Sequence, residues 1–96
     1  MKINIQQKLH DKKMSRYELA KRIGVTYPTI DNIYKGNSTS IKLDILESIC
    51  KELDCLPIEI LIFDDPIMKE RQKERLLAYY NAINSHTNND IQNNKP

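Results

Sequence analysis

The sequence predicts an all-α protein, and two observations support this. Among its 96 residues the chain has two glycines and four prolines, too few turn residues for a fold built of β-hairpins. Its apolar residues recur three and four positions apart, which is the spacing of one helix face. The stripes are Ile5 with Leu9; Leu19 with Ala20 and Ile23; Ile30 with Ile33; and Ile45, Leu46, Ile49, Cys50 and Leu53.

After the stripe of Ile5 and Leu9, a second helix is expected to begin near Ser15. Ser15 and Glu18 match the S-x-x-E capping box, in which the hydroxyl and the carboxylate each bond to a free amide at the helix start. Gly24 follows the stripe where a left-handed glycine commonly ends a helix. The second helix is therefore short, about nine residues.

A third helix is expected from about residue 26 to residue 35. Either Thr26 or Tyr27 is its N-cap, because Pro28 fits the first turn of a helix but disfavours the helical conformation in the residue before it. Lys35 and Gly36 end this helix, and residues 37–40 form a polar loop. A fourth helix runs from residue 41 or 42 to 53, and a short fifth element runs from residue 57 to 62.

A further helix is expected after Asp64 and Asp65, which form an acidic turn or a helix cap, and it begins at Pro66. Its first half is polar and its second half is apolar. The Asn-rich residues 85–96 are expected to be disordered. The predicted organisation is a domain over residues 1–63, a helix within residues 64–84 and a tail over residues 85–96.

Charge is distributed unevenly along the chain. Residues 1–42 carry nine Lys and Arg against three Asp and Glu, whereas residues 43–96 carry six against ten. A localised basic face is typical of proteins that bind polyanions. The alternative is a mixed, solvated surface that happens to be asymmetric.

Composition excludes several classes of protein. The two cysteines do not form a disulfide framework, and no secretory signal follows Met1, so a cytoplasmic location is expected. No apolar run approaches the roughly 20 residues that span a bilayer. His10 and His86 lack partners at metal-ligand spacing, so no metal or other cofactor is expected. We find no nucleophile with its base and no phosphate-binding glycine loop, so the chain is not expected to be an enzyme.

The second and third helices, joined across Gly24 and Val25, have the form of a helix-turn-helix. Residues 15–36, S-R-Y-E-L-A-K-R-I-G-V-T-Y-P-T-I-D-N-I-Y-K-G, closely resemble the phage Cro and repressor family, and the resemblance extends to about Ile62. It implies a five-helix, lambda-repressor-like DNA-binding domain, followed here by the additional C-terminal helix. In that family the helix matching residues 26–35 enters the major groove of double-stranded DNA.

The resemblance implies which residues contact DNA. Tyr27, Pro28, Thr29 and Asn32 match the base-reading positions, and their chemistry favours A·T base pairs. The residues expected to contact the phosphate backbone are Arg16, Thr26, Lys35, Asn37, Ser38 and Lys42. We assign Asp31 to solvent or to a neighbouring cation, unless it accepts from cytosine. Tyr17, Tyr27 and Tyr34 are alternatively half-buried packing residues, and we retain only Tyr27 as a contact.

Two functions remain open at this point. The first is a phage- or plasmid-type regulator, expected to be a repressor, that binds a short pseudo-palindrome as a homodimer. Leu76, Tyr80 and Ile83 share one face of the C-terminal helix and are the expected dimer contacts, although this face could instead pack on its own domain or bind a different protein. The second is a protein-interaction module on the same fold, such as an antitoxin, an anti-repressor or a phage anti-defence factor. No small-molecule ligand is expected for either.

Overall fold

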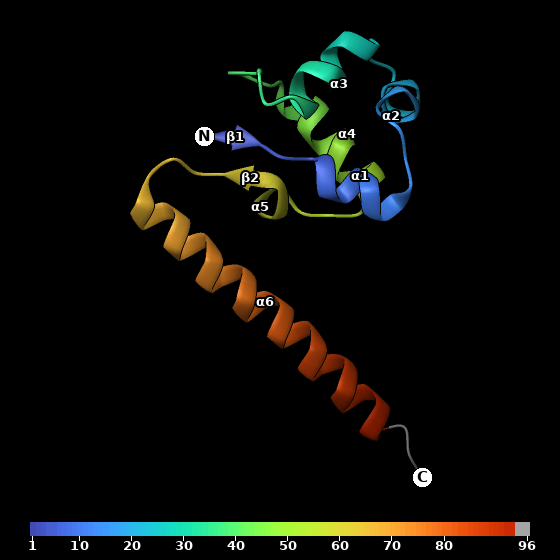
Figure 1. Ribbon diagram of the computed structural model, residues 1–96. Coiled ribbons are helices and arrows are strands. Elements are labelled where there is room, and N and C mark those ends of the chain that lie inside the picture. The colour runs from blue at the N-terminus through green and yellow to red at the C-terminus, as the bar shows by residue number, and fades with distance from the viewer. Residues whose placement is uncertain (94–96) are drawn as a thin grey trace. The chain divides into compact units, whose positions relative to one another are not determined.

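The structure is a computed structural model that describes residues 1–93, with side chains through Ser85 (Figure 1). The chain divides after Asp64 into two compact units. The described elements, in chain order, are β1 Lys2–Ile3, α1 Gln6–Lys12, α2 Arg16–Ile23, α3 Tyr27–Tyr34, α4 Leu43–Leu53, α5 Pro57–Ile60, β2 Leu61–Ile62 and α6 Pro66–Asn93. This confirms the all-α fold class, with five helices in the first unit and one in the second.

The first unit has one hydrophobic core, to which each of its five helices contributes. Its fully or almost fully buried residues are Ile5, Leu9, Leu19, Ala20, Ile30, Ile33, Ile49, Cys50, Leu53 and Ile60. Ile23 and Val25 are half-buried and pack against this cluster. The apolar residues of α2 and α3 thus share one core, and α2 packs against both α3 and α4.

The N-terminus of α2 realises half of the expected capping box. Ser15 Oγ accepts a hydrogen bond from the backbone N–H of Glu18 at 3.0 Å. The Glu18 carboxylate does not return to Ser15 but accepts from Arg22, 2.8 Å away and one turn further along the helix. A guanidinium at this spacing offers a charge-assisted hydrogen bond, which competes with the capping amide.

Both ends of α3 follow from local sequence. Gly24 ends α2 at φ 77°, and Thr26 is the N-cap of α3, which decides between the two expected caps. At the other end Gly36 is left-handed, with φ 76°. The amides of Gly36 and Asn37 bond back to the carbonyls of Ile33 and Asn32, at 3.1 and 3.0 Å. This pair of backbone hydrogen bonds is the Schellman motif, and it fixes the path of the chain that leaves α3.

The fifth element differs from the expectation, because its last two residues are not helical. α5 ends at Ile60, and Leu61–Ile62 forms the strand β2, antiparallel to β1. The Asn4 amide also donates to the Ile60 carbonyl at 2.8 Å. The N-terminal residues thus supply backbone partners from far away in the sequence, and a local pattern cannot reveal such pairing.

In the described part of the second unit, residues 65–93, α6 is the single element. Asp65 Oδ1 accepts from the Met68 amide at 3.0 Å, which confirms the expected acidic cap before Pro66. The helix continues to Asn93, past the end expected at residue 84, since no glycine or proline interrupts it and a formed helix gains one bond per added residue. Residues 94–96 of the expected tail lie outside the described residues. None of the described helices is long and apolar enough to cross a membrane.

Candidate nucleic-acid interface

The helix α3 has one buried side and one open side. Ile30 and Ile33 are buried in the core and fix the rotation of the helix about its axis. Tyr27, Pro28 and Asn32 are exposed as a consequence, and Tyr27 keeps 40% of its surface open to solvent. The residues matched to base reading therefore lie on α3 where another molecule can reach them, although Thr29 is half-buried.

The residues expected to contact the phosphate backbone of DNA surround α3. They come from the first residue of α2, the two caps of α3, the following loop and the N-cap of α4. These are Arg16, Thr26, Lys35, Asn37, Ser38 and Lys42. All ten expected contact residues thus belong to the first unit.

One partly open hollow brings four of the ten together. Thr29 and Asn32 of α3 line it, along with Ser38 and Lys42 from the following loop. Ile33, Ser40, Ile41 and Ile45 complete its lining. The Schellman bonds after α3 turn the chain back here, so an amide, three hydroxyls and an ammonium group share one opening. Lys42 makes no ion pair within the part of the chain that the structure describes.

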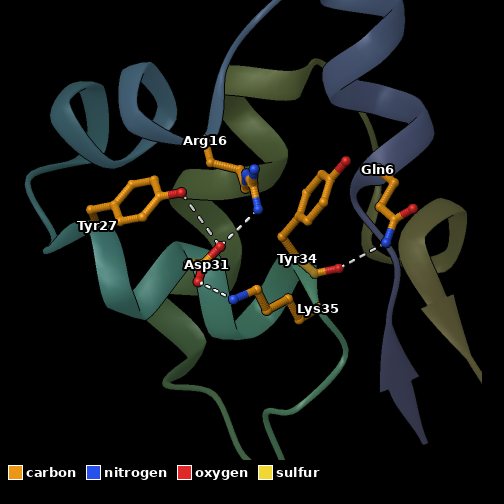
Figure 2. A network of polar contacts seen from close by, with 6 residues as sticks. All are labelled: Gln6, Arg16, Tyr27, Asp31, Tyr34 and Lys35. Carbon is orange, nitrogen blue, oxygen red and sulfur yellow. Dashed lines mark hydrogen bonds and ion pairs between the residues drawn. The ribbon is translucent and has the colours of Figure 1, made fainter.

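A second group converges on Asp31, at the middle of α3 (Figure 2). Arg16 Nη1 lies 2.8 Å from Asp31 Oδ1, and Lys35 Nζ lies 2.9 Å from Asp31 Oδ2. The Tyr27 hydroxyl is 3.5 Å from Oδ1, a weak contact. Sequence analysis assigned Asp31 to solvent or to a neighbouring cation. The structure shows that its carboxylate pairs with two cations, Arg16 and Lys35.

Arg16 is also held from its other side. Its guanidinium stacks on the Tyr34 ring in a cation–π contact. The Arg16 Cζ atom lies 4.4 Å from the ring centroid. The Tyr34 carbonyl accepts from Gln6 Nε2 at 3.0 Å, so α1 supports the same cluster (Figure 2). Sequence reasoning missed the parts that Gln6 and Tyr34 play, because they depend on contacts between separate helices.

The tyrosines differ from one another in burial. Tyr34 is half-buried and packs against the core, as expected. Tyr17 is 66% exposed, so the expectation that it packs was wrong. It lies in the first turn of α2, whose inward positions are taken by Leu19 and Ala20. Arg22, which is not among the ten expected contact residues, pairs with Glu18 and lies 3.7 Å from Glu52 of α4.

The Asp31 carboxyl is acidified by its surroundings. The hydrogen bond from Lys35 is the main cause that holds its pKa below the ordinary value of 3.8, and the charges of Lys35 and Arg16 act in the same direction. Burial opposes them but does not reverse the shift. Asp31 is therefore ionised at neutral pH, and its negative charge offsets part of the positive charge of this face.

The remaining reactive groups lie in or against the core. Cys50 is buried and Cys55 is half-buried, as expected for packing residues. Burial is the main cause that raises the pKa of Cys55 to about 11, so it is a neutral thiol at physiological pH. Within the described residues, no three His, Cys, Asp or Glu side chains are grouped to hold a metal ion.

Comparison with known proteins agrees with this geometry. The profile of the Cro/C1-type HTH DNA-binding domain matches residues 4–66, which include all ten expected contact residues. A Bacillus subtilis (strain 168) protein, described as the uncharacterized HTH-type transcriptional regulator YozG, is 42% identical over 59 residues. That match covers 62% of this chain and 70% of the relative. The chain belongs to the Cro/C1-type helix-turn-helix family of DNA-binding domains.

Proposed function

We propose that the chain is a transcriptional repressor that binds a short pseudo-palindromic operator as a homodimer, with α3 in the major groove. The observation that carries this proposal is the hollow beside α3. The Asn32 amide, which can pair with a base edge, and Lys42, which can bind a phosphate, both line this hollow. An operator-bound protein represses by occupying DNA that polymerase needs, which requires no further contact.

Base reading is assigned to the open side of α3. Asn32 can bond bidentately to adenine, and the Tyr27 ring and Pro28 can contact thymine methyl groups. Thr29 shares a hydrogen bond with Thr26, their hydroxyl oxygens being 2.8 Å apart, and its second lone pair can accept from a base. This set favours A·T base pairs in each half-site.

Phosphate binding is assigned to the residues around the helix. Lys42, Lys35 and Arg16 supply positive charge, and Thr26, Asn37 and Ser38 supply neutral hydrogen-bonding groups. Such contacts fix the position of α3 on the duplex without reading its sequence. Their combined effect is an affinity that falls steeply as salt concentration rises, because each neutralised phosphate releases counterions.

Dimerisation is assigned to α6. Leu76, Tyr80 and Ile83 lie four and three residues apart, on one face of this helix. Within residues 65–93, the described part of the second unit, α6 is the single element, so a partner element for this face must come from outside that unit. A second copy supplies a matching face, and two-fold symmetry places two copies of α3 on half-sites about one helical turn apart.

The test is selection of binding sites from random duplex DNA, with the full chain and two variants. Asn32→Ala should remove the preference for one base pair, an effect of about 1–3 kcal/mol. Lys35→Ala should weaken all sequences alike and make the salt dependence shallower by about 0.9. Asn81→Ala on α6 and Lys51→Ala on α4 are controls of the same chemistry, and both should bind as the parent does.

A different outcome would redirect the search. If no site is enriched and the Asn32 and Lys35 variants match the parent at low salt, α3 does not read DNA. The protein-interaction function, as an antitoxin, an anti-repressor or a phage anti-defence factor, would then take its place. The next experiment would be a search for protein partners.

A further inference from the structure

We propose that Asp31 acts as an internal stand-in for a DNA phosphate: it holds Arg16 and Lys35 and thereby weakens the binding of this face to DNA of any sequence. The inference rests on the proposed function, since both cations are assigned to the phosphate backbone. The proposed function names residues that create affinity for DNA, and the inference adds one residue, Asp31, that lowers this affinity.

The geometry of the cluster matches that of a phosphate contact. Two cations from two helices approach one anion, and each carboxylate oxygen takes one of them, at 2.8 and 2.9 Å. Charge-assisted bonds from Lys or Arg to phosphate have similar lengths of about 2.7–2.9 Å. In the free protein the Asp31 carboxylate therefore accepts the hydrogen bonds that Arg16 and Lys35 would otherwise donate to a phosphate.

The exposure of the three side chains shows how a phosphate would meet them. Lys35 is 56% exposed and Arg16 is 36% exposed, whereas Asp31 is only 17% exposed. An approaching phosphate thus reaches the cations before the carboxylate. To bind either cation it must share it with Asp31 or displace Asp31 from it.

Either route is unfavourable, because the two anions end up close together. A phosphate oxygen bonded to Lys35 or Arg16 lies within about 6 Å of the carboxylate, a distance at which like charges repel. The cluster as a whole offers one net positive charge in place of two. Since Asp31 stays ionised at neutral pH, this penalty is always present under physiological conditions.

A role for Asp31 in reading cytosine fits the structure less well. Each carboxylate oxygen already accepts from a cation, and Oδ1 also faces the Tyr27 hydroxyl (Figure 2). Figure 2 shows the side chain directed toward Arg16 and Lys35. The two roles predict opposite results when the charge is removed.

The test compares the full chain with Asp31→Asn, by fluorescence anisotropy on a short duplex of scrambled sequence over a range of salt concentrations. Asp31→Asn keeps the shape of the side chain and removes its charge. We expect affinity near physiological salt to rise about tenfold, and the slope of log K against log salt to steepen by about 0.9, as one more phosphate is neutralised. Asp31→Ser, a second neutral replacement, should act in the same direction.

Two controls separate this effect from a general change of charge or fold. Asp31→Glu keeps the anion and should bind as weakly as the parent. Asp54→Asn removes one negative charge at the C-cap of α4, where Asp54 lies 3.9 Å from Lys12. The backbone there is left-handed, with φ 51°, which asparagine tolerates well. Its affinity should change less than about twofold, and thermal unfolding should show that all variants are folded.

The inference is overturned if the two neutral Asp31 variants bind scrambled DNA no better than Asp54→Asn does, while the parent binds. It is also overturned if they bind a selected site more weakly and lose the preference for one G·C pair, because Asp31 would then read cytosine. If neither the parent nor any variant binds duplex DNA at low salt, the proposed function fails and the inference falls with it. Binding by the neutral variants alone would support it.

Discussion

The first unit, residues 1–64, and the helix α6 carry the same kind of apolar spacing but differ in what they can pack it against. In the first unit the stripes of five helices converge, and Leu19, Ile30 and Ile49 are fully buried. In the described part of the second unit, residues 65–93, Leu76 and Ile83 share a face of α6, which is the single element there. The same pattern thus leads to a core in one region and to an unassigned surface in the other.

This difference shows what apolar spacing determines. It fixes which side chains of a helix face the same way, but the partner comes from another part of the same chain or from another molecule. The contacts that stabilise the first unit against unfolding should therefore lie within that unit. Under the proposed homodimer, the order of α6 should depend on protein concentration.

The largest expected effect is the loss of a core side chain. Ile30→Ala should lower the free energy of unfolding by about 3–4 kcal/mol, because it removes a fully buried side chain and leaves a cavity. Leu43→Ala is the control: Leu43 is 81% exposed, so the change should stay within about 0.5 kcal/mol. Urea denaturation followed by circular dichroism measures both. If both variants lost the same free energy of unfolding, Ile30 would not be a core residue.

Local signals were sufficient for most of the first unit. Ser15, Gly24 and Gly36 mark helix ends through their own backbone and side-chain chemistry, so the sequence alone locates α2 and α3. The strand pair was missed, because Leu61 and Ile62 become extended through hydrogen bonds with residues at the other end of the unit. No local pattern carries that information.

The candidate site was predictable in its positions but not in its electrostatics. The spacing of Ile30 and Ile33 determines which residues of α3 face outward. The pairing of Asp31 with Arg16 depends on how α2 and α3 cross, and the residues are 15 positions apart. Sequence reasoning left Asp31 between solvent and a cation for this reason.

The next effect concerns α6 and tests the other side of the comparison. Ile83→Asp should raise the dimer dissociation constant about tenfold or more, or about 1.4 kcal/mol, because it puts a charge into an apolar contact. Ala78→Asp adds the same charge on the opposite face of the helix and should leave the dimer intact. Sedimentation equilibrium of the full chain distinguishes them. A parent that stays monomeric at high concentration would rule out this dimer.

A smaller effect compares the two helix starts within the first unit. Ser15→Ala should cost about 1 kcal/mol, because Ser15 Oγ accepts from the Glu18 amide. Thr26→Ala should cost less, since the Thr26 hydroxyl bonds to Thr29 Oγ1 and to no helix amide. The difference between their urea midpoints is the measurement. If Thr26→Ala were the more costly change, the capping assignment would be reversed.

The smallest effect is a dependence on acid. The pKa of Asp31 is lowered in the folded protein, so its ion pairs stabilise the fold fully above the unfolded value of 3.8. That contribution disappears as the pH falls through the lower, folded value. Carboxyl NMR should give a titration midpoint for Asp31 below 3.8, and the unfolding midpoints of the parent and Asp31→Asn should converge in strong acid.

The two cations should contribute unequally to this shift. The hydrogen bond from Lys35 is its largest cause, so Lys35→Gln should move the Asp31 midpoint toward 3.8 further than Arg16→Gln does. A midpoint at or above 3.8 in the parent would mean that neither ion pair persists in solution. In that case Arg16 and Lys35 would already be free for phosphate, and the comparison between the first unit and α6 would rest on their apolar side chains alone.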